Sequence, residues 1–313
     1  MGELSTQGHS AKQPYAVLAL FAGAVAIATA APFVKVSEAG PVSTAFWRVF
    51  LALPFLWAWM LAESRPAAAP ANAARERRLM TLAGLFFAGD LAVWHWSIVL
   101  TSVAAATLLA NLAPIFVTLA VWLLFRQRPT LPFTCGLAVG ITGVALLVGA
   151  DVRLSGMALL GDVLGVITAM FYAAYQLTVT RLRSTTATSR IMAWSSLVMA
   201  AALLSIALVS GEQFLPVTAA GWAKVTALAL IAQVAGQSLI AYAMAHLPPR
   251  LSSVGLLLQP VMAALFAWAL LGETLGAFQI VGGIMVLVGI RIAHQAESGK
   301  SAKVAQAAGF KTE

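Results

Sequence analysis

Long apolar segments alternate with short polar connections along almost the whole chain. Ten of these segments have roughly the 20 residues that a helix needs to cross the hydrocarbon core of a bilayer. Their residues do not alternate between apolar and polar, as the strands of a membrane barrel do, so the pattern predicts helices. The ten predicted spans cover residues 15–36, 43–61, 79–100, 103–125, 131–150, 159–182, 190–210, 221–245, 251–271 and 275–293.

The two halves of this pattern resemble each other. Proline and glycine positions recur without a gap after a shift of 146 residues: Pro114 falls on Pro260, Gly136 on Gly282 and Gly143 on Gly289. Because each half holds five spans, an odd number, the halves enter the membrane from opposite sides, as in many secondary transporters. We therefore predict an all-α membrane protein in which ten transmembrane helices form two five-helix inverted-topology repeats around a central cavity.

The predicted parts of the chain follow from these spans. Residues 1–14 form an N-terminal tail, residues 15–150 the first repeat, residues 151–294 the second repeat, and residues 295–313 a C-terminal tail. The first span could also be a cleaved signal peptide. A retained helix is the better interpretation, because cleavage would leave nine spans and break the duplication.

Composition supports a membrane location. The 313 residues are 61% hydrophobic and 10% charged, whereas a soluble domain has about 25% charged residues. The net charge of +8 does not indicate nucleic-acid binding, because the basic residues lie in loops beside the spans. Fifteen of the 19 Lys and Arg residues fall on the side of the predicted bundle that carries both termini. Since positive loops resist translocation, both termini are expected in the cytoplasm.

Polar side chains within the spans fall on shared helical faces. Asn111, Pro114 and Thr118 lie on one face of the fourth span, and Pro114 and Pro260 should kink their helices near mid-membrane. Any single polar residue could instead be a hydrogen bond between helices. Convergence of several faces favours a cavity. The candidate substrate-binding residues are Asp90, Trp94, His95, Asn111, Tyr175, Gln176, Gln237, Tyr242 and Gln259, and the candidate gating or anchoring residues are Arg48, Pro114 and Pro260.

Two charged residues lie well inside spans. Asp90 is near the middle of the third span, and Arg48 lies in the second. A charge at mid-membrane costs about 2.5–3.5 kcal/mol on insertion scales, so each must be paired, hydrated or neutral. Arg48 could anchor a carboxylate, and Asp90 could relay protons or gate a pathway. The structural alternative is an Arg48–Asp90 ion pair.

The order of these features resembles the drug/metabolite transporter superfamily. The paired prolines, Arg48 near the start of the second span and the motif "LLGE" ending at Glu273 are similar to the ten-helix EamA-type exporters, and most similar to their aromatic amino-acid exporter subgroup. The first half departs from this pattern, with "FRQRP" in place of "LLGE". The resemblance implies a basket-like bundle with a cavity lined by spans one, three, four, six, eight and nine. It also implies export of amino acids or related metabolites without ATP.

Three functions are compatible with these residues. The leading hypothesis is a secondary exporter of amino acids, including aromatic and bulky apolar ones, that works by alternating access. The alternative is a proton-coupled antiporter of cationic drugs that uses Asp90. An intramembrane enzyme is disfavoured, because His95 and Asp90 are five residues apart and point to different sides of a helix.

The remaining expectations concern partners. The single cysteine, Cys135, excludes an internal disulfide and a cysteine-based metal site, and we expect neither metal nor cofactor. The expected partners are a small-molecule substrate and the lipid bilayer, with no nucleic acid. We expect a multi-pass protein of the bacterial inner membrane, as a monomer with a dimer as the alternative.

Overall fold

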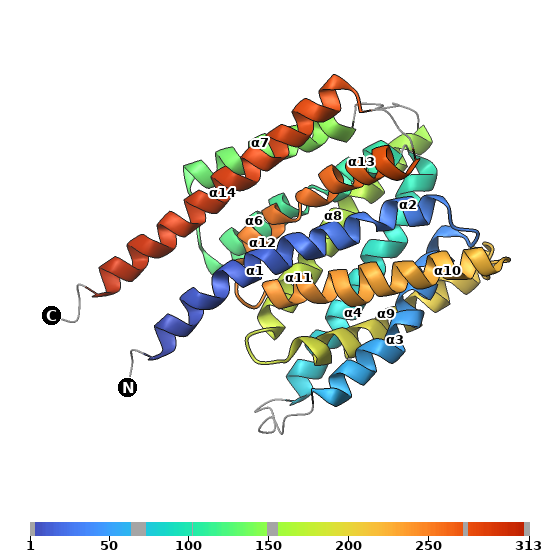
Figure 1. Cartoon of the computed structure of the whole chain (residues 1–313), viewed down its shortest axis with the longest axis horizontal. Helices are drawn as coiled ribbons and strands as arrows, with labels where there is room; N and C mark the ends of the chain where they lie inside the picture. The colour runs from blue at the N-terminus through green and yellow to red at the C-terminus, as the bar shows by residue number, and fades with distance from the viewer. Residues whose placement is uncertain (1–3, 64–72, 102, 149–155, 272–274, 310–313) are drawn as a thin grey trace.

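The computed structural model describes residues 4–63, 73–101, 103–148, 156–271 and 275–309, and the regular elements in these ranges are all helical (Figure 1). In chain order they are α1 (Leu4–Ala28), α2 (Ala30–Lys35), α3 (Pro41–Ala62), α4 (Ala73–Leu100), α5 (Val103–Ala110), α6 (Ala113–Phe125), α7 (Leu131–Val148), α8 (Gly156–Leu182), α9 (Thr188–Ser210), α10 (Ala219–Leu228), the π-helix η1 (Ala229–Gly236), α11 (Gln237–Ala243), α12 (Pro249–Gly255), α13 (Leu258–Leu271) and α14 (Ala277–Gly309).

These helices correspond to the ten predicted spans. Within the described ranges, eight helical segments are long and apolar enough to cross a bilayer. The shorter apolar helices Pro14–Ala28 and Leu131–Leu147 occupy the positions of the first and fifth spans. The start of α1 and the end of α14 lie at the same end of the bundle, as an even number of crossings requires (Figure 1). The predicted ten-helix membrane fold is confirmed. Glu273, the last residue of the "LLGE" motif, lies outside the described residues.

The fourth and ninth spans are each broken at the same place in the repeat. The fourth divides into α5 and α6 at residues 111–112, and the ninth divides into α12 and α13 at residues 256–257. Pro114 and Pro260 follow these breaks within four residues, and a proline ring clashes with the carbonyl four residues earlier. Short turns replace the helical bonds: Asn111 N donates to Leu108 O at 3.1 Å, and Leu257 N donates to Val254 O at 3.0 Å.

Glycines bring α7 and α14 into backbone contact. A Cβ on Gly136 would lie 2.9 Å from the carbonyl oxygen of Gly289, and a Cβ on Gly143 would lie 2.7 Å from that of Gly282. Residue numbers rise along one helix as they fall along the other, so the helices are antiparallel. In the repeat, Gly136 corresponds to Gly282 and Gly143 corresponds to Gly289. Each of the two contacts is therefore the symmetry-related copy of the other. That relation is the twofold symmetry expected of inverted repeats.

Contacts between other helices show the same symmetry. In the repeat, span three corresponds to span eight, span six to span one, and span four to span nine. The third and sixth spans meet as α4 and α8, and their counterparts meet as α1 against η1 and α11. The fourth and sixth spans meet as α6 and α8, and their counterparts meet as α13 and α1. The inverted repeat therefore organises the whole bundle.

Two adjacent glycines on α14 provide a test of the α7/α14 contact. A Cβ on Gly282 would lie 2.5 Å from Leu147 N and 2.6 Å from Gly143 O, both backbone atoms. A Cβ on Gly283 would lie 3.5 Å from its nearest neighbour, an ordinary contact. We expect Gly282→Ala to separate the helices and destabilise the protein by about 1–3 kcal/mol. Gly283→Ala should be neutral or stabilising, because alanine favours helix. Thermal unfolding of the two variants in detergent measures the difference, and equal midpoints would contradict the close contact.

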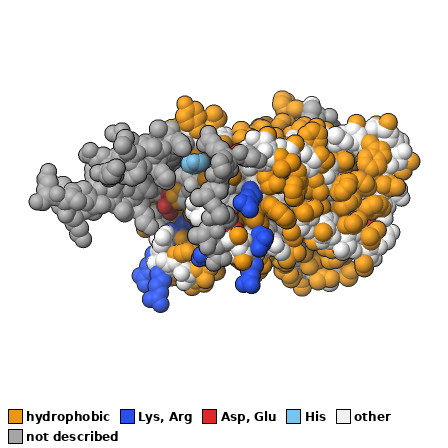
Figure 2. Space-filling model, turned by 90° about the horizontal axis from the view of Figure 1, so that it is seen from below, with side chains coloured by type: hydrophobic (Ala, Val, Ile, Leu, Met, Phe, Trp, Pro, Cys, Tyr) orange, Lys and Arg blue, Asp and Glu red, His pale blue; other side chains and the backbone are white. Residues whose placement is uncertain are grey.

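The surface has the character of a membrane protein. Figure 2 shows apolar side chains over much of one face, while Lys and Arg side chains gather toward the end that carries the termini. Large exposed apolar residues in the middle of the helices include Leu119, Met170, Leu197 and Ile284. Such a surface requires lipid contact around the middle of the bundle.

At the opposite end, Glu38 ties the connection after α2 to the start of α10. Its carboxylate accepts hydrogen bonds from Val217 N at 2.9 Å, Thr218 N at 2.9 Å and Thr218 Oγ1 at 2.5 Å. The hydroxyl bond of Thr218, followed by its backbone bond, lowers the pKa of Glu38 below its ordinary value. Nearby, Gly40 N donates to Gln213 O, and the Trp47 indole donates to Phe214 O at 2.8 Å.

The lowered pKa predicts how Glu38 contributes to stability. Because the pKa is lower in the folded chain, the stabilisation is complete above the unfolded value of about 4.3 and is lost as the pH falls through the folded value. Glu38→Gln should therefore lower the thermal midpoint at pH 7 by more than it does at pH 3. Thr218→Ser keeps the hydroxyl donor and should behave like the wild type. If Glu38→Gln lowered the thermal midpoint equally at both pH values, the charge of Glu38 would not be the cause of its stabilising effect.

Candidate functional site

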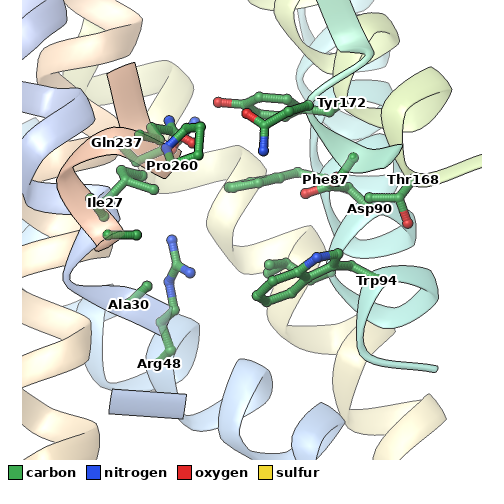
Figure 3. A pocket seen from close by; sticks show the side chains of 16 residues that line it. Ile27, Ala30, Arg48, Phe87, Asp90, Trp94, Thr168, Tyr172, Gln237 and Pro260 are labelled. Carbon is green, nitrogen blue, oxygen red and sulfur yellow. The ribbon is translucent and has the colours of Figure 1, made fainter. Parts of the chain in front are cut away.

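A cavity of about 150 Å³ lies at the centre of the bundle (Figure 3). Side chains from seven of the ten spans line it, including the six spans that the family resemblance implied and also the second span. The lining residues are Ile27, Ala28, Ala30, Arg48, Phe87, Asp90, Leu91, Trp94, Ala110, Asn111, Thr168, Tyr172, Gln237, Gln259, Pro260 and Ala263.

The broken helices form part of the cavity wall. Ala110 and Asn111 lie at the end of α5 and in the break that follows it, while Gln259 and Pro260 lie in the first turn of α13. Backbone that leaves a helix inside a membrane must be buried in protein or line a polar cavity. Both prolines are buried. Pro260 lines the cavity, whereas Pro114, in the first turn of α6, is not among the lining residues.

Arg48 and Asp90 face the cavity from different sides. Figure 3 shows the guanidinium of Arg48 extending from α3 toward the space that Asp90 borders from α4. Both side chains are at least nine-tenths buried. In the described part of the chain, no ion pair within 4.0 Å joins them, and Nε of Arg48 has no hydrogen-bond partner. The cavity therefore presents one buried guanidinium and one buried carboxyl group that make no direct ion-pair contact.

Aromatic rings and amides complete the wall. Trp94, Phe87 and Tyr172 present their rings to the cavity, and Gln237 and Pro260 lie opposite them (Figure 3). The hydroxyl of Tyr172 lies close to the side chain of Gln259. An apolar group could pack against these rings while its polar end reaches Arg48 or Asp90.

Four of the predicted substrate-binding residues lie outside this wall. Tyr175 is behind it, where its hydroxyl accepts a hydrogen bond of 2.8 Å from Gln237 Nε2 and its ring stacks on Phe87 at 4.6 Å. His95 is buried with Nδ1 2.5 Å from Leu91 O. Tyr242 packs against His246, and Gln176 is buried without a hydrogen-bond partner among the described residues.

Sequence reasoning missed several lining residues. Phe87 and Leu91 share a face of α4 with Asp90 and Trp94, at helical spacings of three and four residues, so the same periodicity could have identified them. The small residues Ala28 and Ala30 lie where α1 ends and α2 begins, around the interruption at Thr29. The polar periodicity that identified the other faces cannot identify small apolar residues as part of the cavity wall.

Two inverted five-helix repeats around a buried cavity with charged walls define a membrane transporter. The chain belongs to the EamA-like transporter family, whose model matches residues 14–149 and, a second time, residues 159–293. This double match confirms the duplication that the prolines and glycines predicted. The protein is therefore a multi-pass membrane transporter of a small molecule and not an enzyme.

Individual relatives agree with this assignment. Two proteins of Archaeoglobus fulgidus, each described as an uncharacterized transporter, are both 25% identical to the chain. The first aligns over 89% of this chain and 96% of its own length, and the second over 82% and 90%. A crystal structure with 17% identity superposes with a TM-score of 0.72 over 90% of this chain and 96% of its own, which establishes similarity of fold.

Proposed function

We propose that the protein is a secondary exporter of amino acids, including aromatic and bulky apolar ones. The observation that supports this most is the separated Arg48 and Asp90 in an aromatic cavity. An amino acid carries a carboxylate for Arg48, an ammonium group for Asp90 and a side chain for the rings of Trp94, Phe87 and Tyr172. The resemblance of the sequence to aromatic amino-acid exporters, which remains a prediction, suggests the same class of substrate.

Buried polar atoms beyond the cavity support alternating access. Thr118, Ser252 and Ser253, together with Gln176, lie on α6, α12 and α8, which pack against one another. Their side-chain polar atoms have no hydrogen-bond partner among the described residues. An unsatisfied buried polar group costs about 1–3 kcal/mol. We infer that these atoms meet water or substrate when this seam opens toward the end that carries the termini.

Arg250 holds that end closed in this conformation. Its guanidinium donates to the carbonyl of Gln127, after α6, and lies 3.8 Å from Glu297 on α14. The loop charges support placing this end in the cytoplasm. We further propose that the protein is a monomer in a bacterial inner membrane. Opening of this end toward the cytoplasm then requires the Arg250 contacts to break.

A direct flux measurement tests the proposal. Purified protein in liposomes preloaded with unlabelled tryptophan or methionine should accumulate the same labelled amino acid by exchange, well above protein-free liposomes. Glucose, which carries no charge, serves as the control substrate and should not exchange. Flux of both amino acids at the level of protein-free liposomes would exclude this substrate class.

A proton-coupled antiporter of cationic drugs remains the second candidate. Asp90 beside the ring of Trp94 is an environment that attracts organic cations. Arg48 in the same cavity repels them, which favours a zwitterion. Uptake of a lipophilic cation driven by a proton gradient, and its loss in Asp90→Asn, would support this candidate.

A further inference from the structure

A second cavity of about 540 Å³ lies between α1, α13 and α14, and none of its lining residues belongs to the central cavity. We name it the α1/α14 groove. Most of its wall is apolar, and polar side chains occur at one end only. The apolar lining residues are Val17, Phe21, Leu258, Leu287 and Ile290, and the polar ones are Arg291, His294 and Gln295.

The polar end of the groove lies at the membrane boundary. Arg291 and His294 are within the last two turns of the apolar segment Ala277–Glu297, at the end of the bundle that carries the termini. Ile290 and Leu287 continue the groove about one and two turns deeper than His294 along the same helix. The groove therefore runs from headgroup depth into the hydrocarbon region, over about 12 Å of α14 from Leu287 to Gln295.

The positive charge in this groove is not neutralised by the neighbouring acid. Glu297, one turn beyond His294, lies 3.8 Å from Arg250 on α12. Among the described residues, neither the side chain of Arg291 nor that of His294 has an ion-pair or hydrogen-bond partner. Arg291 is exposed at the groove, so its guanidinium is available to an anion.

We propose that the α1/α14 groove binds one anionic glycerophospholipid from the leaflet at the end of the bundle that carries the termini. An acyl chain lies along Val17, Phe21 and Leu287, and the phosphate is held by Arg291 and His294. Basic pockets between transmembrane helices are suited to such headgroups, because phosphate contacts with Arg are charge-assisted and bidentate. Water in the apolar part of the groove would gain few hydrogen bonds, which favours an acyl chain there.

The position of the groove links the lipid to the broken ninth span. Leu258, which lines the groove, is the first residue of α13, and the next two residues, Gln259 and Pro260, line the central cavity. A bound acyl chain would therefore support the start of α13 from the side opposite the substrate. This inference is independent of the proposed substrate, because it rests on a different cavity.

Lipid retention by the purified full-length protein tests the proposal. The delipidated protein in detergent is titrated with dioleoyl phosphatidylglycerol or dioleoyl phosphatidylcholine, and native mass spectrometry counts the bound molecules. We expect one phosphatidylglycerol to be retained in preference to phosphatidylcholine. Arg291→Gln combined with His294→Gln should weaken that retention about fivefold to tenfold. Arg181→Gln, which removes an exposed arginine from the last turn of α8 at the same end, should leave retention unchanged.

A second variant separates the acyl chain from the charge. Leu287→Trp fills the groove without altering Arg291 or His294 and should weaken retention of both lipids, even where the double glutamine variant fails to fold. Inorganic phosphate should not displace the lipid. Equal retention of the two lipids by the wild type would overturn the proposal. So would a loss in the double variant no larger than that in Arg181→Gln, or displacement by phosphate alone.

Discussion

Replacing Arg48 with glutamine is expected to weaken transport of tryptophan by about 12-fold to 160-fold, since hydrogen bonds to charged groups contribute about 1.5–3 kcal/mol. The guanidinium is buried in the cavity wall and Nε has no partner among the described residues. Glutamine keeps a polar head of shorter reach but cannot offer a positive charge to a carboxylate. Arg48→Lys keeps the charge without the planar fork and should retain part of the activity.

The stability of the same variant distinguishes a substrate anchor from a structural ion pair. Breaking a buried pair leaves the partner charge unpaired and typically costs 3–5 kcal/mol, as an order of magnitude. Arg48 and Asp90 are not in ion-pair contact, so Arg48→Gln removes a buried cation without breaking a pair. We therefore expect the unfolding midpoint to stay the same or to rise while transport falls. A large loss of stability would show that the arginine holds the fold.

Substrate analogues make the role of Arg48 specific. Tryptamine lacks the carboxylate, so its binding should be insensitive to Arg48→Gln or should improve when the repulsive cation is removed. Indole-3-propionate retains the carboxylate and should lose affinity as tryptophan does. Competition of each analogue with labelled tryptophan, in wild type and variant, measures these changes. An equal loss for tryptophan and tryptamine would contradict carboxylate binding by Arg48.

The repeat and the ten spans could be predicted from sequence because they rest on strong local signals. A helix that crosses lipid needs a long apolar run, and a proline within such a run marks a break wherever it occurs. The shift that aligns Pro114 with Pro260 also aligns the glycines of α7 and α14, and the structure places those glycines at the crossing of the two repeats.

The cavity wall was only partly predictable. Helical periodicity shows which residues share a face of a helix, but it does not show whether that face borders a cavity or another helix. Asp90, Trp94, Asn111, Gln237 and Gln259 do line the cavity. Tyr175 and Gln176 lie on the same helix as the lining residue Tyr172, yet their side chains are enclosed by neighbouring helices. A polar residue facing a cavity and one facing another helix have the same pattern in sequence, and only the packing of α8 against α4 separates them.

Replacing Asp90 with asparagine is expected to reduce transport of tryptophan by a similar factor, about 30-fold, through loss of the ammonium contact. The two analogues should respond to Asp90→Asn in the opposite way to their response to Arg48→Gln. Indole-3-propionate, which has no ammonium group, should bind Asp90→Asn as well as it binds the wild type or better. Tryptamine should lose affinity in step with tryptophan. The pair of variants thus assigns each end of the zwitterion to one wall of the cavity.

The same variant decides between the two candidate functions. If Asp90 binds the substrate ammonium, Asp90→Asn should lower tryptophan exchange both with and without a proton gradient, because the contact is needed for binding and not for coupling. If Asp90 couples drug export to protons, Asp90→Asn should abolish gradient-driven flux while exchange in the absence of a gradient persists. Thr168→Val, which alters the cavity wall without removing either charge, provides the control for general damage to the cavity. Wild-type exchange together with wild-type gradient-driven flux in Asp90→Asn would contradict both roles, because neither substrate binding nor proton coupling would then depend on the one carboxylate among the described residues of the cavity wall.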